Sequence, residues 1–319
     1  MQKNSIAVSV LCNVYNHEKY LEECLTSLVN QKTNFKYEIL VHDDCSTDSS
    51  VKIINDFYRK YPNKIVPFFE HENQYSKGVK ITKDIMISKI KGKYFCFCEG
   101  DDYWTDNNKL QKQYDFLENN PDYKFCVHNS IRVNKNGIEI EKRNTKIGGG
   151  DLTCEDFIIS GGSFVATNSI FSYSSLTKKL PKCFDIMATD YIWQIYLSSF
   201  GKTYCFNDYM SAYRIQSDGS WTCRMLANPD QLIKHKERLI KAFKCFDKDM
   251  NYRFHSSVEF AILKIEYAIL LIKKDYKSMR SRTYKKIYKK EKIKTKIKYF
   301  LDEHFPRVYN KIKQIRSKK

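Results

Sequence analysis

The sequence predicts an α/β fold, a Rossmann-like sheet flanked by helices, with a helical C-terminal extension. Three observations predict it. An apolar run followed by a segment of helical periodicity recurs four times, and such units build a parallel sheet that is covered on both faces. Acidic clusters directly follow two of these runs. From residue 230 onward the hydrophobic period is helical throughout.

The first strand is predicted at residues 6–12, where IAVSVLC forms a short apolar run. A helix follows, because Leu21, Leu25 and Val29 fall at helical spacing. The same alternation then repeats three times along the chain. The remaining strands are expected in YEILVHDD (37–44), KIVPFF (64–69) and GKYFCFC (92–98), and the helices in SSVKIINDFYRKYP (49–62), near residues 79–90 and in KLQKQYDFLENNP (109–121).

The pattern changes after the fourth unit. Residues 123–141 are predicted to form a strand and a turn at Asn136-Gly137, and GGGD at residues 148–151 marks a break. Mixed α and β structure is expected up to about residue 221. In the helical region beyond it, one apolar stripe indicates packing against the rest of the protein. The stripe consists of Phe254, Val258, Ala261, Ile265, Ala268 and Ile272.

The composition is that of a globular protein, with 319 residues of which 42% are hydrophobic. The N-terminal MQKNSIAVSVLC carries no recognisable secretory signal, and the charges within VEFAILKIEYAILLI argue against a transmembrane helix. The eleven cysteines are scattered without a C-x-x-C pair, and the seven histidines lack zinc-ligand spacing. These facts favour reduced core cysteines and a cytoplasmic protein without structural zinc.

The net charge of +18 is concentrated at the C-terminus. Residues 273–319 hold 19 Lys and Arg against 4 Asp and Glu, a net charge of +15, which leaves +3 for residues 1–272. A nucleic-acid enzyme usually spreads positive charge over the surface that holds its substrate, so no nucleic-acid partner is expected. The basic segment predicts attachment to an anionic membrane surface, with packing on the main domain as the alternative.

Three carboxylates crowd together behind the strand predicted at residues 92–98, in the stretch FCFCEGDDYWTD. They are Glu99, Asp101 and Asp102. Like charges this close raise one another's pKa and disfavour burial unless a cation or hydrogen-bond donors neutralise them. Oxygen ligands at the carboxyl end of a strand suit Mg²⁺ or Mn²⁺. The alternative is a solvated acidic turn before a helix that Thr105 or Asp106 caps.

A second acidic pair, Asp43-Asp44, follows YEILVH and precedes CSTDSS. Ser46 or Asp48 is expected to cap the next helix. The carboxylate of Asp44 could accept hydrogen bonds from a ribose hydroxyl or a base N–H, as acids do in nucleotide sites at sheet switch points. The sequence contains neither G-x-G-x-x-G nor a G-K-[ST] phosphate loop, which disfavours a dinucleotide or P-loop enzyme.

Three segments together resemble the catalytic domain of the inverting glycosyltransferases of family 2. They are VSVLCNVYNHEKYLEECLTSLVNQ, YEILVHDDCSTDSS and GKYFCFCEGDDYWTDNNKLQKQYDFLENNP, within a match of about residues 5–221. The resemblance implies a GT-A fold, a nucleotide-diphosphate sugar donor, with a UDP-sugar expected, and Mn²⁺ or Mg²⁺. It also implies a glycan or lipid-linked acceptor in surface polysaccharide synthesis. The expected domains are a GT-A domain at 1–225, with a nucleotide-sugar half at about 1–130 and an acceptor half at about 131–225, and a basic helical extension at 226–319.

The resemblance assigns the contacts to the donor. Tyr15 in NVYN resembles the aromatic residue that stacks on the nucleotide base, and Asn13 lines the same pocket. Asp44 matches the acid that hydrogen-bonds the base. Lys83 falls where the family often has a phosphate-contacting Arg, and its ammonium group can act as a point charge on the diphosphate. A strand-end residue is the alternative for Tyr15, and a solvated helix face is the alternative for Lys83.

The EGDD segment takes the place of the family's D-x-D-type motif. Asp101 and Asp102 are the expected metal ligands, and Glu99 and Asp101 are expected to contact the ribose or donor sugar. MATDYIWQIYL, residues 187–197, resembles the segment with the catalytic base, which assigns that role to Asp190. As a general base, its carboxylate would take the proton from an acceptor hydroxyl that attacks the anomeric carbon in line, with inversion. Helix capping is the alternative.

YRIQSDGSW, residues 213–221, resembles the acceptor-side loop, where relatives often have a histidine near Gln216. Its absence puts a protein nitrogen ligand for the metal in doubt. Acceptor contacts are expected from aromatic rings, which suit the C–H faces of pyranoses, and from one arginine. Core packing is the alternative for the aromatic residues. These acceptor residues are Tyr103, Trp104, Arg214 and Trp221.

Two other functions remain open. A metal-dependent enzyme or binder of nucleic acid would combine the paired acids with the basic tail, but the near-neutral residues 1–272 argue against it. A non-catalytic sugar-binding relative would keep the pocket without turnover, and the presence of Asp190 argues against that. The preferred prediction is a cytoplasmic glycosyltransferase, peripheral on the inner face of the cell membrane. Its donor sugar and acceptor depend on loop shape.

Overall fold

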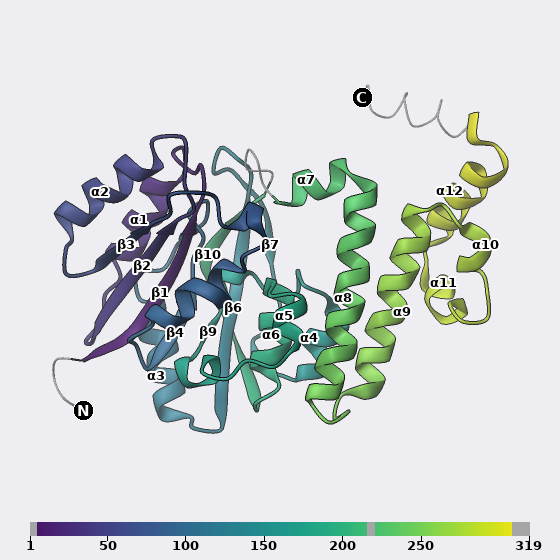
Figure 1. The fold of residues 1–319 in the computed structure, drawn as a ribbon. Helices are drawn as coiled ribbons and strands as arrows, with labels where there is room; N and C mark the ends of the chain where they lie inside the picture. The colour runs from purple at the N-terminus through teal and green to yellow at the C-terminus, as the bar shows by residue number, and fades with distance from the viewer. Residues whose placement is uncertain (1–4, 216–220, 308–319) are drawn as a thin grey trace.

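The computed structural model describes residues 5–215 and 221–307, and within them the chain forms a ten-stranded mixed sheet (Figure 1). The main path of the sheet has the order β3-β2-β1-β4-β9-β6-β10-β5, with β7 paired to β6 and β8 to β10. The strands are β1 (Ile6–Val14), β2 (Lys36–Asp43), β3 (Ile65–Phe69), β4 (Tyr94–Phe97), β5 (Tyr103–Trp104), β6 (Tyr123–Val133), β7 (Glu139–Arg143), β8 (Gly150–Leu152), β9 (Phe171–Tyr173) and β10 (Lys202–Arg214).

The four strands of the predicted βα units are parallel neighbours, as the sequence predicts. Beyond β4 the sheet becomes mixed, because β9 runs antiparallel to both β4 and β6. β10 runs parallel to β6 and antiparallel to β5. The carboxyl ends of β1, β2 and β4 therefore meet at one edge of the sheet, and the acidic segments follow two of them.

Helices cover both faces of the sheet. The segment near residues 79–90 is not the predicted α-helix but a π-helical turn (Ile81–Met86) and a 3-10 turn (Ile87–Lys89). It is rich in β-branched residues, which lower the propensity for α-helix. The α-helices are α1 (Leu21–Val29), α2 (Ser50–Lys60), α3 (Lys109–Asn119), α4 (Cys154–Ser160), α5 (Cys183–Ile186), α6 (Asp190–Ser198), α7 (Trp221–Ala227), α8 (Pro229–Asp249), α9 (His255–Ile272), α10 (Tyr276–Met279), α11 (Lys285–Lys290) and α12 (Ile293–His304).

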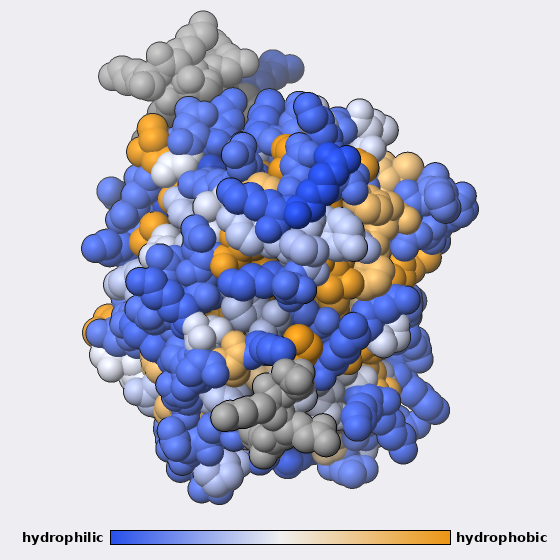
Figure 2. Space-filling view, turned by 90° about the vertical axis from the view of Figure 1, so that its left-hand side faces the viewer, coloured by the Kyte–Doolittle hydropathy of each residue, from blue (hydrophilic) through white to orange (hydrophobic). Residues whose placement is uncertain are grey.

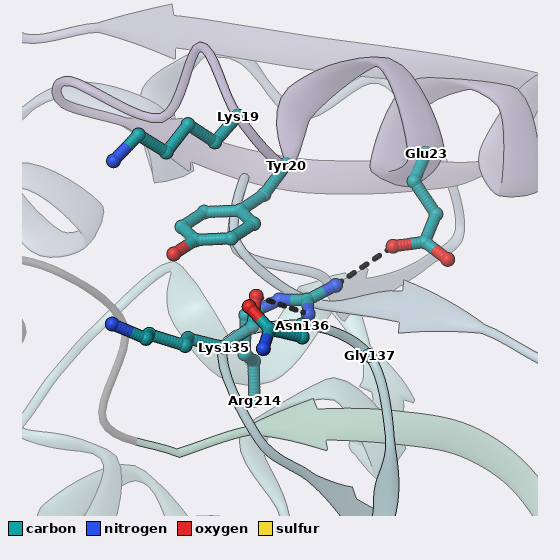
Figure 3. Close-up of a pocket in the computed structure, with 7 residues that line it drawn as sticks. All are labelled: Lys19, Tyr20, Glu23, Lys135, Asn136, Gly137 and Arg214. Carbon is teal, nitrogen blue, oxygen red and sulfur yellow. Dashed lines mark hydrogen bonds and ion pairs between the residues drawn. The ribbon is translucent and has the colours of Figure 1, made fainter.

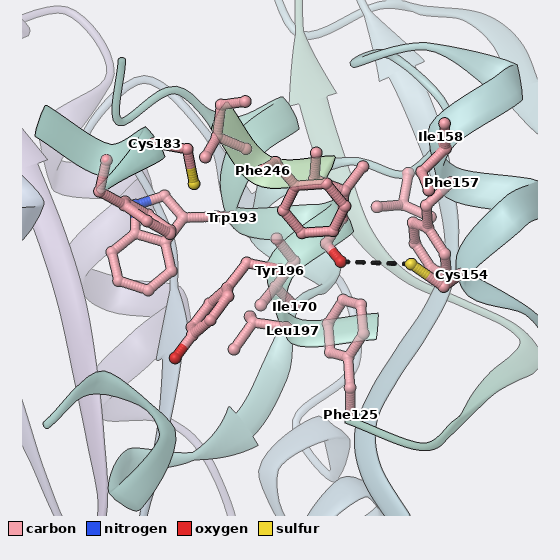
Figure 4. Packing of buried hydrophobic residues seen from close by; sticks show 14 of the residues in the cluster. Phe125, Cys154, Phe157, Ile158, Ile170, Cys183, Trp193, Tyr196, Leu197 and Phe246 are labelled. Atoms are coloured by element: carbon pink, nitrogen blue, oxygen red, sulfur yellow. Dashed lines mark hydrogen bonds between the residues drawn. The ribbon is translucent and has the colours of Figure 1, made fainter. Parts of the chain in front are cut away.

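Two hydrophobic clusters lie on opposite faces of the sheet. In β1, Val8 and Val10 pack on the side of α1, α2 and α3, and Leu11 packs on the other side. This explains why the buried strand is nearly continuous in apolar residues. The second side, shown in Figure 4, is filled by α4, α5, α6 and the helices α8 and α9. Phe246 of α8 and Val258 of α9 are buried there, so both helices share the core of the sheet.

The helices α10, α11 and α12 pack against the end of α9, away from the sheet (Figure 1). Tyr267, Tyr276 and Met279 form their small buried cluster. No helix in the described part of the chain is both long and apolar enough to cross a membrane. The face seen in Figure 2 is predominantly hydrophilic, with one apolar area toward the upper right and smaller apolar groups between the charged side chains.

Candidate active site

The acidic turn, residues 99–102, lies at the sheet edge between the ends of β1 and β4. Its backbone is fixed by hydrogen bonds from Gly100 N to Asn13 O (2.9 Å) and from Asp102 N to Glu99 O (3.0 Å). A Cβ atom at Gly100 would lie 2.7 Å from Nδ1 of His17, so only glycine allows this close approach. The turn is thus held tightly against the loop that follows β1, where the nucleotide-binding residues are expected.

Asp102 is buried, and both of its carboxylate oxygens accept hydrogen bonds within the protein. Oδ1 accepts from Arg214 N (2.8 Å), and Oδ2 accepts from Nδ2 of Asn168 (3.0 Å). Burial raises the pKa of Asp102 well above its usual range, and the charge of Asp101 adds to this rise. Asp102 therefore anchors the turn to β10 and to the 3-10 turn Thr167–Ser169.

Arg214, expected to contact the acceptor, is 5% exposed, and its guanidinium lies between Tyr20 and Glu23, at the start of α1, and the loop of Lys135 (Figure 3). Its Nε donates to Asp101 O (2.9 Å), and Nη2 donates to Oε2 of Glu23 (2.7 Å). The guanidinium also lies 4.5 Å from the ring centroid of Tyr20. It borders a cavity of about 400 Å³ that Lys19 and Lys135 also line. In this structure the side chain of Arg214 mainly stabilises the acidic turn.

Asp190 begins α6 and lies close to the acidic turn. Oδ2 of Asp190 accepts a hydrogen bond from Oγ1 of Thr167 (2.7 Å). The residue is exposed to solvent at one side, but the surrounding protein atoms desolvate its carboxyl group and raise its pKa. The pKa of Glu99 is raised well above its usual range by burial and then by the charges of Asp190 and Asp101. The predicted base and the predicted donor site are therefore brought together.

Three residues that sequence reasoning missed connect these groups. Thr167 orients Asp190, and its neighbour Asn168 holds Asp102 and Ala212 O through Nδ2. The only signal was a polar triplet, TNS, inside an apolar segment. Tyr213 is the third: burial raises the pKa of its phenol, and the carboxylates of the site, Asp102 first, raise it further. Its hydroxyl therefore stays protonated and is a hydrogen-bond donor.

Asp44 is buried at the end of β2 and holds a neighbouring loop. Oδ1 accepts from Gln74 N (2.7 Å), and Oδ2 accepts from Tyr75 N (3.1 Å). Nδ2 of Asn73 donates to Asp44 O (3.1 Å). The carboxylate fixes this loop beside the position expected for the nucleotide base, and each oxygen retains acceptor capacity.

The loop after β1 is fastened to the loop after β2. Tyr15 is 40% exposed there, and Asn13 donates from Nδ2 to Oγ1 of Thr82 (3.4 Å) while its buried Oδ1 has no hydrogen-bond partner among the described residues. Ser49 occupies the N-cap position of α2 without a side-chain hydrogen bond, but Asp48, one of the two predicted caps, accepts the N–H of Ser50, the first residue of the helix. The side chains of Ser46 and Asp48 also accept N–H groups from the loop after β1. These bonds join Asn16 N to Ser46 Oγ (2.9 Å), and Glu18 N and Ser50 N to Asp48 (3.0 and 2.9 Å).

Lys83 lies in the π-helical turn, with its ammonium group in an ion pair. Nζ lies 2.8 Å from Oδ1 of Asp185 in α5 and 3.2 Å from Oδ1 of Asp84. These bonds, the one to Asp185 foremost, raise the pKa of Lys83. The expected phosphate-binding group is therefore charged and engaged by carboxylates in this structure.

Trp104 is 3% exposed and belongs to the core, which corrects its assignment to the acceptor site. Its Nε1 donates to Asn168 O (3.2 Å), and Nζ of the buried Lys109 lies 4.0 Å from the ring centroid. Tyr103 is partly exposed, 5.7 Å from the guanidinium of Arg214. The side chain of Trp221 and the whole of Gln216 lie outside the described residues.

Within the described residues, no group of three or more His, Cys, Asp or Glu side chains is arranged to hold a metal ion. The site nevertheless fits a cation that is completed by substrate, because Mg²⁺ is usually bound through one or two carboxylates together with phosphates. Glu99 and Asp101 would supply its oxygen ligands, and the charges of Asp190 and Asp101 add to the burial that raises the pKa of Glu99.

Residues 9–174 match the family model described as Glycosyl transferase family 2. The chain belongs to this family. An uncharacterized protein of Mycobacterium tuberculosis is 28% identical over 218 residues, which are 67% of this chain and 60% of that protein. The poly(ribitol-phosphate) beta-glucosyltransferase of Bacillus spizizenii is 38% identical over 114 residues, which are 35% of this chain and 17% of that protein. The chain thus spans about 60% of the length of the first of these relatives.

A solved structure supports the fold of this family 2 member. Staphylococcus aureus TarS 1–349, in complex with UDP-GlcNAc, superimposes with a TM-score of 0.57 at 16% identity, covering 85% of this chain and 80% of that chain. The mixed sheet flanked by helices is therefore the GT-A fold, as the resemblance implied. The helical region that follows it is also present.

Proposed function

We propose that the protein is a metal-dependent, inverting glycosyltransferase that moves a sugar from a UDP-sugar to a hydroxyl of a glycan or lipid-linked acceptor in surface polysaccharide synthesis. The observation that carries the proposal is the convergence of Asp190 with Glu99 and Asp101 at the sheet edge. Family membership supports the reaction class. The poly(ribitol-phosphate) relative and the UDP-GlcNAc complex of TarS support the acceptor and donor classes.

The donor is proposed to bind across the ends of β1, β2 and β4. Tyr15 offers an exposed ring for the base, and the unpartnered Oδ1 of Asn13 is an acceptor beside it. Asp44 would accept the base N–H while it holds its loop in place. Lys83 would contact the diphosphate after release from Asp185.

The cation, Mn²⁺ or Mg²⁺, is proposed to bind Asp101, with Glu99 beside it. Asp102 was also expected to be a ligand, but both of its oxygens accept hydrogen bonds, so we assign it the task of holding the turn. When bound, the cation would supply Lewis-acid stabilisation of the diphosphate leaving group.

Asp190 is proposed to act as the general base. Thr167 donates to Oδ2 and so fixes the orientation of the carboxylate. The other oxygen, Oδ1, would accept the proton of the acceptor hydroxyl. The raised pKa of Asp190 makes it a stronger base than an ordinary aspartate. Attack from the side opposite the leaving group inverts the anomeric carbon.

The basic C-terminal segment, residues 273–319, is proposed to hold the enzyme on an anionic membrane surface, the inner face of the cell membrane. Its net charge of +15 supports this, since each basic residue close to such a surface contributes up to about 1 kcal/mol. A membrane position would bring the site near lipid-linked acceptors.

The test is a thermal-shift screen of nucleotide sugars with and without Mn²⁺. UDP-sugars should raise the melting temperature only when Mn²⁺ is present, and Asp101→Asn should abolish this response without lowering the melting temperature of the free protein. Asp115→Asn, an exposed change on α3, is the matched control and should keep the response. An unchanged metal-dependent shift in Asp101→Asn would remove the site assignment.

A further inference from the structure

The helix α12 has one face that packs on the protein. Oδ2 of the buried Asp302 accepts a hydrogen bond from the hydroxyl of Tyr276 (2.5 Å) and pairs with Nζ of Lys274 (2.9 Å). The ring of Tyr299 stacks on that of Tyr276 at a centroid distance of 5.3 Å. These contacts fix the rotation of α12 about its own axis, and so they decide which residues face outward.

The opposite face of α12 carries an exposed apolar stripe. Ile293, Ile297 and Phe300 are 76%, 52% and 52% exposed. Their spacing of four and three residues places them within about 60° of one another around the helix. From the sequence alone these three residues cannot be separated from Tyr288 and Tyr299. The structure packs both tyrosines against the small C-terminal cluster.

The surface around this stripe is positively charged. Lys292, Lys294 and Lys298 are exposed beside it. The acidic residues of the helix are engaged elsewhere: Asp302 is bound as described, and Glu303 pairs with Arg280 through two hydrogen bonds of 2.7 and 2.8 Å. The exposed face of α12 therefore combines lysines with large apolar side chains.

We infer that α12 is an interfacial helix that inserts Ile293, Ile297 and Phe300 into the headgroup boundary of an anionic bilayer. Basic residues that flank an apolar stripe are the pattern of such helices. A second copy of this chain would bring the same lysines into mutual repulsion, and a nucleic acid would leave the stripe in water. Charge complementarity therefore favours anionic lipid as the occupant.

Insertion would also orient the enzyme. In Figure 1 the carboxyl ends of β1 and β2 and the helix α12 lie toward the same end of the molecule. The inference rests on the membrane attachment proposed above, but not on the chemistry of the site.

The experiment compares two triple variants of the full chain in flotation with vesicles of phosphatidylcholine and phosphatidylglycerol. Ile293→Ser with Ile297→Ser and Phe300→Ser should lower partitioning by about tenfold or more, because the apolar contribution is lost at unchanged charge. The matched control replaces three exposed isoleucines on and near β7 with serine. It is Ile138→Ser, Ile140→Ser and Ile147→Ser, and it should bind like the unmodified protein.

The outcomes separate the hypotheses. Equal, salt-sensitive binding of both triple variants would overturn insertion and leave purely electrostatic attachment. A change of oligomeric state in the α12 triple variant, seen by sedimentation without vesicles, would assign the stripe to a second copy and overturn the inference. Phe300→Trp gives an independent readout, since its added emission should shift to the blue with anionic vesicles. Sugar transfer to a soluble acceptor should be the same in all variants, which keeps this test separate from that of the proposed reaction.

Discussion

The acidic segments after β2 and β4 have the same signature in the sequence and different surroundings in the structure. After β2, Asp43 accepts Ser46 N through Oδ2 (2.9 Å), and Asp44 accepts two loop N–H groups, so the carboxylates are used to hold loops. After β4, the pKa values of Glu99 and Asp102 are raised well above their usual range, mainly by burial.

The difference lies in what faces the acids: backbone N–H groups face Asp43 and Asp44, whereas burial and neighbouring carboxylates act on Glu99. Backbone N–H groups stabilise a carboxylate in its charged form, whereas burial with like charges destabilises it. Asp190, which is distant in the sequence, adds a further carboxylate to the second segment. The first segment should therefore respond to mutation through loop stability, and the second through ligand binding and turnover.

The largest expected effect is on turnover. Asp190→Asn should lower the rate of transfer by about 10²–10⁴-fold, because the amide cannot accept the proton of the acceptor hydroxyl. Donor affinity and melting temperature should stay close to those of the unmodified protein. Turnover, donor binding and melting should be measured on one preparation. A variant with lowered stability but nearly normal turnover would show that Asp190 is only a helix-capping residue.

The pH dependence follows from the same group. The base must be ionised, and its pKa is raised by desolvation, so kcat/KM should fall as the pH is lowered through a value above the ordinary range of aspartate. Asp190→Asn should lose this acidic limb. If the acidic limb of the kcat/KM profile lies at the ordinary aspartate pKa, or persists in Asp190→Asn, a group other than Asp190 controls the pH dependence.

The next largest effect is on stability, and its sign is expected to differ between the acidic segments after β2 and β4. Asp44→Asn should destabilise the protein by about 1–2 kcal/mol, because an amide can satisfy only one of the two loop N–H groups. Glu99→Gln should raise the melting temperature of the ligand-free protein by about 2–4 °C at neutral pH.

The sign for Glu99 follows from its raised pKa. The folded state binds the proton of Glu99 more tightly than the unfolded state does. The contribution of Glu99 to stability is therefore fully present below the unfolded pKa and is lost as the pH rises through the folded pKa. The stabilisation by Glu99→Gln should therefore shrink toward acidic pH. Destabilisation by both variants at neutral pH would remove the contrast between the segments.

The smallest expected effect concerns Lys83. Asp185→Asn should tighten donor binding by about two- to fivefold, since an exposed ion pair of up to about 1 kcal/mol no longer competes with the diphosphate. Asp56→Asn, which removes a comparable surface pair with Arg59, is the matched control and should leave donor affinity unchanged. Equal donor affinity in Asp185→Asn, Asp56→Asn and the unmodified protein would count against a phosphate contact by Lys83.

The sequence determined the βα half of the fold, because its signals are local. Apolar runs and helical spacing place β1, α1, β2, α2, β4 and α3 close to their observed bounds. The placement of acids at strand ends also follows from the sequence, since the acidic clusters stand directly behind apolar runs. The acidic cluster that contains Asp101 stands out from the residues alone, whereas Asp190 could be singled out only with the additional resemblance to family 2.

Tertiary structure decided which of the predicted residues are exposed and which are buried as supports. Trp104 and Arg214 are polar or aromatic residues beside the acidic turn, yet both are buried as supports, because the partners Asn168 and Glu23 come from distant segments. Thr167 and Tyr213 gain their roles only when the 3-10 turn Thr167–Ser169 and β10 reach the same sheet edge. Contacts of this kind depend on strand order and helix rotation, which a local pattern does not encode, and the outward stripe of α12 was decided in the same way.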